Sequence, residues 1–286
     1  MHSSEFRKVA MAGMLMALLT SCSRTPSSPA AKVAAQPAVQ PSAGAQTTTT
    51  STATGHVKLR LLPAIGENVD SFPRVVPNEN VSPPMAATLN TKFDRLDSDM
   101  RKGLHECKTG ARKMHPDDSA FDYEHKLSVS MRGPRYLSVL VSDAYFCGGA
   151  HPENNDEALV YDVTTGAAID WLTMLPGSSI GYKAEDTSHS SSVIWPPLQQ
   201  LALEQADDDC KDVYREKNLS FILWPDADQG AIVAEADGLS HISSALCGEQ
   251  VVLDIPSAQR LGISPTLLSL VVAAHAASQT SAAKNH

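Results

Sequence analysis

The chain contains five cysteines, and their number and placement constrain its fold more than any other feature of the sequence. Cys22 ends an N-terminal apolar run, and the other four are Cys107, Cys147, Cys210 and Cys247. An even number in an oxidising compartment is typical of disulfides, and four cysteines allow three connectivities. We favour Cys107 with Cys147 and Cys210 with Cys247, because each link would then join a helix to a neighbouring strand or loop. Closing a loop of about 40 residues contributes about 3–4 kcal/mol in the chain-entropy model.

Zinc is the alternative use for four cysteines, but neither Cys-x-x-Cys nor His-x-x-x-His spacing occurs. Asp207, Asp208 and Asp209 suggest calcium, yet they lack the alternating ligands and closing glutamate of an EF-hand. A solvated acidic face explains these aspartates better. We therefore expect no metal and no other cofactor.

The N-terminal residues predict the compartment. Two basic residues precede an apolar run of about ten residues, a secretory-signal pattern that is too short to span a bilayer. The motif Leu19-Thr20-Ser21-Cys22 resembles the lipobox of bacterial lipoproteins, which implies cleavage before Cys22 and its acylation. Several acyl chains give firm anchoring. Ser23 stands where an inner-membrane lipoprotein would carry aspartate, so this resemblance favours the outer membrane. We expect a signal peptide over 1–21 and a periplasmic protein anchored through lipidated Cys22.

Residues 22–55 form the expected lipidated cysteine and disordered tether, because the segment is rich in Ser, Thr, Ala, Pro and Gln and has few large apolar side chains. The remaining sequence has ordinary globular composition, with 42% hydrophobic and 19% charged residues over the whole chain. The net charge is −9, and no basic stripe with interleaved aromatic residues is present. This composition argues against nucleic acid as a partner and favours the approach of basic proteins.

Residues 56–278 are predicted to form a single α+β domain, followed by a flexible tail at 279–286. Alternation of apolar and polar residues from Val57 to Leu61 indicates a first strand. Ser82 and Pro83 begin a helix whose apolar residues recur every three or four positions as far as Cys107, and Gly110 is its expected end.

An antiparallel meander is expected next. Alternation over 121–131 places Phe121, Tyr123, Leu127, Val129 and Met131 on one face. A Gly-Pro turn leads into a second strand over 137–146, and a Gly-Gly bend leads into a third over 158–163. Further along, Pro196 and Pro197 start a helix expected to carry Cys210 and Tyr214 on one side. Short strands at 220–224, 231–235 and 251–255 precede a terminal helix that starts at Pro265 and frays after residue 275.

The residues Tyr145-Phe146-Cys147-Gly148-Gly149-Ala150-His151, followed by Tyr161-Asp162 and Thr165-Gly166, resemble a bacterial extracytoplasmic domain family. Its members include the C-terminal domain of the lysozyme-sensing anti-sigma factor RsiV and the non-catalytic domain of the deacetylase PdaC. The resemblance covers roughly residues 56–273. It implies an α+β binding module with helices packed on an antiparallel sheet, and in one branch the partner is lysozyme. The predicted lipid anchor replaces the transmembrane helix and sigma-binding segment, so sigma control is not implied.

His151 is the strongest candidate for a catalytic residue, because an imidazole can act as acid, base or ligand. A role in fixing the bend by a hydrogen bond is the simpler interpretation, and Asp162 is expected to stabilise its own turn. Three tryptophans, Trp171, Trp195 and Trp224, stand among apolar neighbours and are interpreted as core. No nucleophile elbow, phosphate loop or matched carboxylate pair was found, and no catalytic residue is predicted.

We therefore expect a non-enzymatic module that binds or inhibits a lysozyme-like cell-wall hydrolase or a delivered toxin, as an immunity protein would. The alternative is a peptidoglycan-acting enzyme, or an accessory domain of a cell-wall deacetylase or hydrolase. Partner contacts are expected in the loops at 148–157 and 177–192, because loops on a rigid sheet commonly carry function. The candidate contact residues are His151, Asn154, Asn155 and Tyr182.

Overall fold

The computed structural model describes residues 56–115, 121–149, 151–181, 191–216, 218–239 and 241–283. These lie in one compact unit that runs from Ser51 to His286. The predicted signal peptide, Cys22, the tether to residue 55, and Tyr182 all lie outside the described residues. None of the described helices combines the length and apolar composition that crossing a bilayer requires.

The protein is α+β, as predicted, and both expected disulfides are present. Cys107 is linked to Cys147 and Cys210 to Cys247, with Cα–Cα distances of 4.7 Å and 5.4 Å. The first disulfide joins a long helix to the end of a strand, and the second joins two short helical segments.

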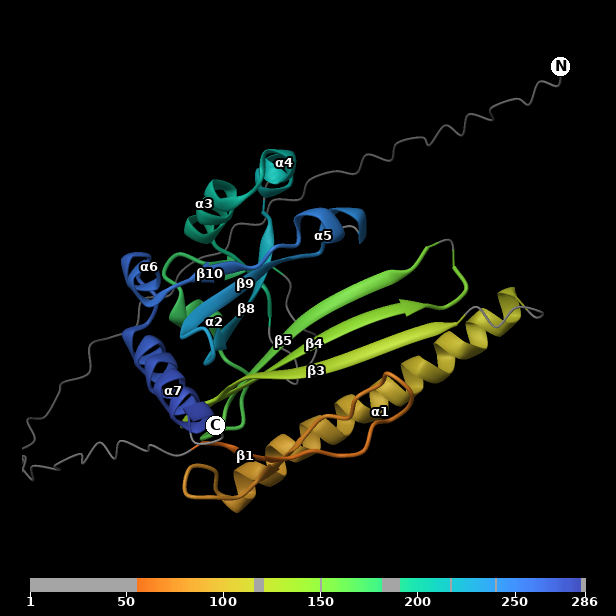
Figure 1. Ribbon diagram of the computed structural model, residues 1–286, viewed down its shortest axis with the longest axis horizontal. Coiled ribbons are helices and arrows are strands. Elements are labelled where there is room, and N and C mark those ends of the chain that lie inside the picture. The colour runs from red at the N-terminus through yellow and green to blue at the C-terminus, as the bar shows by residue number, and fades with distance from the viewer. Residues whose placement is uncertain are drawn as a thin grey trace, which may run out of the picture. The chain divides into compact units, whose positions relative to one another are not determined.

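A three-stranded antiparallel meander forms the centre of the fold (Figure 1). Its strands, in spatial order, are β3 (Asp122–Arg132), β4 (Tyr136–Phe146) and β5 (Glu153–Asp162). The third strand begins five residues earlier than predicted, because β4 is long enough to pair with it as far as Tyr145 opposite Glu153.

The prediction that five residues of 121–131 share one face of the strand is wrong, because β3 contains a bulge. The pairing of β3 with β4 shifts register between Val129 and Met131, which inserts an extra residue and reverses the alternation. Val129 packs against the core under α1, whereas Met131 lies in the core on the opposite side of the sheet. These two residues therefore do not share one face.

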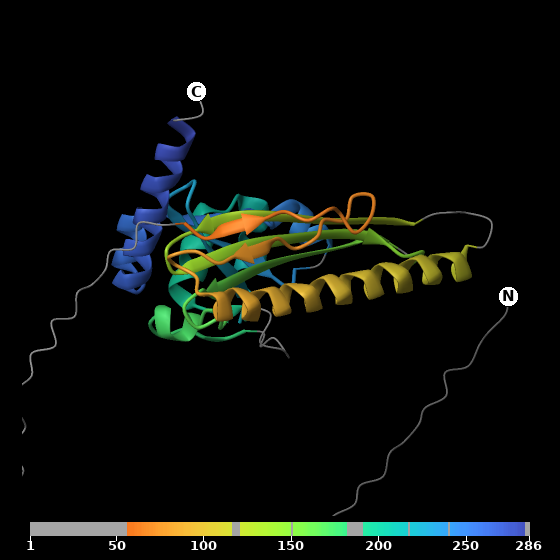
Figure 2. The same cartoon turned by 90° about the horizontal axis from the view of Figure 1, so that it is seen from below.

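Helix α1 (Pro83–Met114) covers one face of the meander and runs along its strands (Figure 2). Its predicted end at Gly110 is wrong, because one more turn packs beneath the bend after β4. Ala111 is buried there, and a Cβ on Gly148 would lie 2.9 Å from the Ala111 Cα. Gly148 also has a φ of +84°, so only glycine passes this point without strain.

A second sheet packs on the other face of the meander. Its spatial order is β10-β9-β8-β7-β6, with antiparallel neighbours throughout. The strands are β6 (Ser179–Ile180), β7 (Val193–Ile194), β8 (Ser220–Asp226), β9 (Ala231–Asp237) and β10 (Val251–Leu253). The helices of this half are α2 (Trp171–Met174), α3 (Pro196–Gln205), α4 (Lys211–Tyr214), α5 (His241–Cys247), α6 (Ile255–Arg260) and α7 (Pro265–Ala283).

Two helix predictions in this half need correction. The helix expected from Pro196 through Tyr214 breaks after Gln205, and a 3₁₀ turn follows at Asp208–Cys210. The break allows Cys210 to bond Cys247, whose carbonyl accepts a 2.6 Å hydrogen bond from the Tyr214 hydroxyl.

The terminal helix α7 continues to Ala283, past the expected fraying point at residue 275 and past the expected domain end at 278. His275 Nδ1 lies 2.7 Å from the Ala227 carbonyl, and Ser278 donates a 2.6 Å hydrogen bond to Asp228. These contacts tie the last turns of the helix to the β8–β9 turn.

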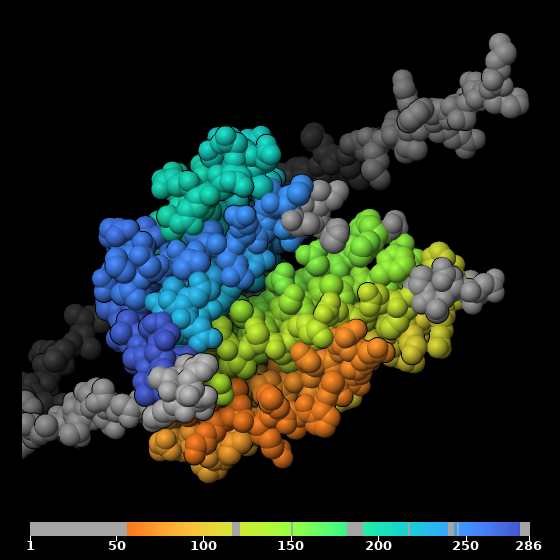
Figure 3. Space-filling view, viewed as in Figure 1, coloured from red at the N-terminus to blue at the C-terminus, as the bar shows by residue number. Residues whose placement is uncertain are grey.

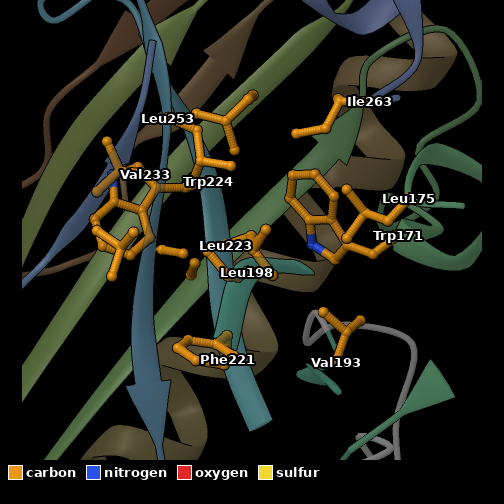
Figure 4. Close-up of a cluster of buried hydrophobic side chains, with 14 of the residues drawn as sticks. Trp171, Leu175, Val193, Leu198, Phe221, Leu223, Trp224, Val233, Leu253 and Ile263 are labelled. Atoms are coloured by element: carbon orange, nitrogen blue, oxygen red, sulfur yellow. The ribbon is translucent and has the colours of Figure 1, made fainter. Parts of the chain in front are cut away.

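All three tryptophans are buried in the core of this half of the protein, as predicted. Figure 4 shows Trp171 beside Leu175 and Ile263 in this core. The acidic run at 207–209 is exposed, which also agrees with the prediction.

A buried carboxylate holds the segment before α1 in place. This segment forms β1 (Lys58–Arg60) and β2 (Arg74–Val76), which pair with each other. Asp97 on α1 accepts hydrogen bonds from the Phe72 amide at 2.9 Å and from Arg74 at 2.7 Å. Arg74 also contacts Asp94 at 2.6 Å, but the Asp94 side chain is 67% exposed while that of Asp97 is 7% exposed.

Replacing Asp97 with alanine should lower the free energy of unfolding by about 1–3 kcal/mol, because it leaves the Phe72 amide without a partner and leaves Arg74 with only the exposed Asp94 as an ion-pair partner. Asp94→Ala removes the same charge from the same arginine at an exposed position and should cost at most about 1 kcal/mol. Urea denaturation of both variants measures the difference. Equal losses would show that Asp97 does not hold the segment.

Candidate binding groove between the two sheets

The two sheets diverge along β5 and leave a groove between them. Its inner part has a volume of about 270 Å³ and its outer part about 90 Å³. Both parts are lined by Asp156, Ile222 and Glu235, so they adjoin each other, and we treat them together as the groove. Figure 3 shows it as a hollow between the green surface of β5 and the blue surface of β9 and α5.

A polar row on the meander forms one wall of the inner groove. Lys126 pairs with Ser142 across β3 and β4, and Ser142 pairs with Asp156 across β4 and β5. Cross-strand partners project from the same face of a sheet, so these three side chains lie in line. The second sheet supplies an apolar opposite wall with Ile222 and Trp224.

Glu235 is the most perturbed acid in the groove. It stands on β9 among buried apolar residues and is itself only partly exposed. Burial, and to a lesser degree the charge of Asp156, raise the pKa of Glu235 to about 7, although a hydrogen bond with Gln250 opposes the shift. The protonated form is favoured because desolvation penalises the charged form.

The charge of the groove is predominantly negative. The charged residues that line it are Lys126, Asp156, Glu157, Glu235 and Asp237. Glu157 pairs with Val141, which packs in the core under α1, so its side chain projects from the opposite face of the meander. Asp156, Glu235 and Asp237 thus face one amine beside an apolar wall, and Glu235 gives its full negative charge only above about pH 7. This arrangement suits a cation with an aliphatic stem, such as a lysine or arginine side chain of a partner.

Two of the four predicted contact residues line this groove. Asn154 and Asn155 lie on β5 at its outer part, where Asn154 donates a 3.1 Å hydrogen bond to Ser244. The Asn154 side chain lies on the groove face with that of Asp156, whereas Asn155 pairs with Asp143 and its side chain projects from the opposite face of the meander, so it lines the groove only through its backbone.

His151 lies apart from the groove lining, on the bend before β5. Its side chain is 64% exposed, and Nδ1 lies 3.2 Å from both Glu153 Oε1 and the Pro152 carbonyl. These contacts are local, and they are of the kind expected for a histidine that fixes the bend by a hydrogen bond.

Asp162 stabilises the turn that follows β5, as predicted. It accepts hydrogen bonds from Arg135 at 2.9 Å and from the Thr164 hydroxyl at 2.6 Å. Burial opposes its ionisation, but the hydrogen bonds from Thr164 and Arg135 outweigh burial and lower its pKa. Asp162 is committed to this turn rather than to His151.

A histidine–aspartate pair lies on the face of the meander opposite the groove. His125 is buried, and its Nδ1 is 2.6 Å from Asp143 Oδ1. The backbone of His125 also bonds to the amide of Asp70 and the carbonyl of Asn68. The pair therefore lies under the segment that precedes α1 and fastens it to the edge of the sheet.

The sequence analysis missed the carboxylates of the groove. Glu235 interrupts the apolar run Ala231-Ile232-Val233-Ala234, and an acid within a buried strand is rare enough to have served as a signal. Asp156 and Asp237 carry no such signal, because Asp156 stands between Asn155 and Glu157 and Asp237 is the last residue of its strand, next to Gly238. Within the described residues, no group of three His, Cys, Asp or Glu is arranged to hold a metal ion.

A comparison of the chain with models of protein families gives no match. A comparison with curated proteins likewise gives no match.

The raised pKa of Glu235 predicts a pH-dependent stability. A glutamate in the unfolded chain ionises near pH 4.5, whereas Glu235 keeps its proton to about pH 7, so wild-type stability should fall as the pH rises through this interval. Glu235→Gln should flatten this fall, and its stability relative to wild type should increase between pH 4 and pH 8. Urea denaturation at pH 4, 6 and 8 tests this expectation, and parallel profiles of the two proteins would contradict it.

Proposed function

We propose that this chain is a periplasmic lipoprotein, anchored to the outer membrane through Cys22, whose folded part binds or inhibits a basic cell-wall hydrolase. The partner is a lysozyme-like enzyme or a toxin delivered by another cell. The acidic groove between the two sheets carries this proposal. The N-terminal lipobox pattern and the resemblance to a family of extracytoplasmic binding domains support it.

The groove offers a basic protein both attraction and burial. Opposite charges steer association and raise its rate, and the net charge of −9 acts in the same direction. A lysine or arginine that enters the inner groove would meet Glu235 and Asp156 at its charged end and Ile222 and Trp224 along its stem. A charged hydrogen bond in such a partly desolvated site is stronger than one at an open surface.

The inner volume also favours a side chain over a glycan. Small-molecule sites commonly occupy about 300–1,000 Å³. The inner groove, at about 270 Å³, is below this range and accommodates one long side chain better than several sugar rings. We therefore place the partner's main contacts along the rim, at Asn154, with one basic side chain inserted.

A second candidate function, glycan hydrolysis, is favoured by one observation. An acid with a pKa near 7 beside a second carboxylate is typical of the general acid of a glycosidase, and Glu235 beside Asp156 has this character. This candidate requires that the purified protein itself cleaves peptidoglycan. It also requires that Glu235→Gln abolishes the cleavage.

Binding is tested with the mature chain carrying Cys22→Ser, which cannot be acylated. Immobilised protein should capture lysozyme or another muralytic enzyme from a periplasmic extract and should reduce its activity on cell walls. The double variant Glu235→Gln/Asp156→Asn should weaken binding tenfold or more, since truncating one side of a desolvated charge pair costs about 2 kcal/mol or more. Binding should also weaken with added salt.

The matched control is Asp208→Asn/Asp209→Asn in the exposed run beside Cys210, and both variants are compared at pH 8, where Glu235 is largely ionised and each variant removes about two charges. This control and His151→Ala should change affinity less than twofold. If no muralytic enzyme is captured, the proposed function is wrong. If capture is equal in the groove variant and the control, the groove is not the binding site.

A further inference from the structure

A second cavity lies on the far side of the meander from α5, between β1, β3 and α7. Its volume is about 370 Å³, larger than the inner groove and within the usual range of small-ligand sites. Figure 1 shows β1 and the C-terminal part of α7 on this side of the molecule. The β8–β9 turn completes the wall with Ala227 and Asp228.

The inner lining of the cavity is apolar. Val57, Met131 and Ala274 line it and are buried, and they come from three separate parts of the chain. Met131 reaches it because the bulge in β3 turns this side chain away from the α1 face. These three side chains are almost fully covered, so the apolar surface open to a ligand comes from Leu59 and Val129, which also line the cavity and are partly exposed. This surface suits a hydrocarbon part of a ligand.

The rim of the cavity is cationic, in contrast to the groove. Lys58 and Arg132 both line it, and neither makes an ion pair with the residues that the structure describes. Asp228 also lines the cavity, and it accepts a 2.6 Å hydrogen bond from Ser278. Two cations against one carboxylate leave a positive rim on an acidic protein.

We propose that this cavity binds a small organic anion with an apolar chain. Its carboxylate or phosphate would lie between Lys58 and Arg132, and its chain would pack on Leu59 and Val129. Arginine offers paired N–H donors to such an anion, and lysine adds a mobile point charge. The same chemistry describes a free amphiphilic anion and the headgroup region of an anionic phospholipid. This site is separate from the groove and does not depend on the function proposed above.

Calorimetric titration of the mature chain carrying Cys22→Ser tests the proposal, with hexyl phosphate as the probe. Hexyl phosphate should bind with one-to-one stoichiometry, and inorganic phosphate and 1-hexanol should each bind at least tenfold more weakly, because each supplies half of the required chemistry. Lys58→Gln/Arg132→Gln should lower the affinity for hexyl phosphate at least tenfold. Leu59→Gln should do the same by making the apolar part of the lining polar while leaving both charges in place.

The controls test whether binding depends on the cavity itself, and not on the overall positive charge of this region or on the groove. Arg60→Gln removes a cation from the same strand at a position outside the cavity lining, and it should change affinity less than twofold. Glu235→Gln should also leave it unchanged. Thermal unfolding checks that each variant is folded. Absence of hexyl phosphate binding, or binding that survives both cavity variants, would overturn the proposal.

Vesicles distinguish the two sources of the anion. If phosphatidylglycerol vesicles bind the protein, phosphatidylcholine vesicles do not, and Lys58→Gln/Arg132→Gln abolishes the difference, the ligand is a membrane lipid. If hexyl phosphate binds in the cavity and neither vesicle does, the ligand is a free anion. Both results support the cavity as an anion site.

Discussion

The fold depends on a meander sheet that is buried on both of its faces. Alternate residues of β4 and β5 enter two separate cores: Leu137, Val139 and Leu159 pack under α1, while Tyr136 and Val160 pack against the second sheet. A strand that is buried on both sides fixes register strongly, because a slip by one residue would exchange the two sets of side chains. The two cores therefore hold α1 and the second sheet in defined positions on either side.

The groove follows from how far the second sheet extends. The strands of the meander continue beyond β8 and β9 (Figure 1). Where the cover ends, the residues on that face change from apolar to polar, from Leu140 and Ala158 to Ser142 and Asp156. Glu235 stands at this boundary, where enough protein surrounds it to penalise its charge and enough space remains for a partner. The same divergence that creates the groove thus creates its unusual acid.

Local pattern predicted the parts of the fold that local chemistry determines. The meander, the start of α1 at Ser82 and Pro83, the start of α7 at Pro265 and the disulfide pairing all follow from periodicity, capping residues and cysteine placement. The errors come from tertiary contacts. The last turn of α1 exists because Ala111 packs against Gly148. The bulge at Val129 and Met131 has no sequence pattern that distinguishes it from continued alternation.

The candidate site was only partly predictable for the same reason. Asn154 and Asn155 could be named because they follow the bend at Gly148 and Gly149, a local feature, whereas the acids facing them come from a strand about 80 residues later, and only packing of the two sheets brings them together. The single strand β3 takes part in both recesses: Lys126 and Ser128 line the acidic groove, and residues 129–132 beyond the bulge line the cationic cavity. One β-bulge therefore separates two sites of opposite charge, which allows an acidic protein to attract a basic partner on one side and an anion on the other.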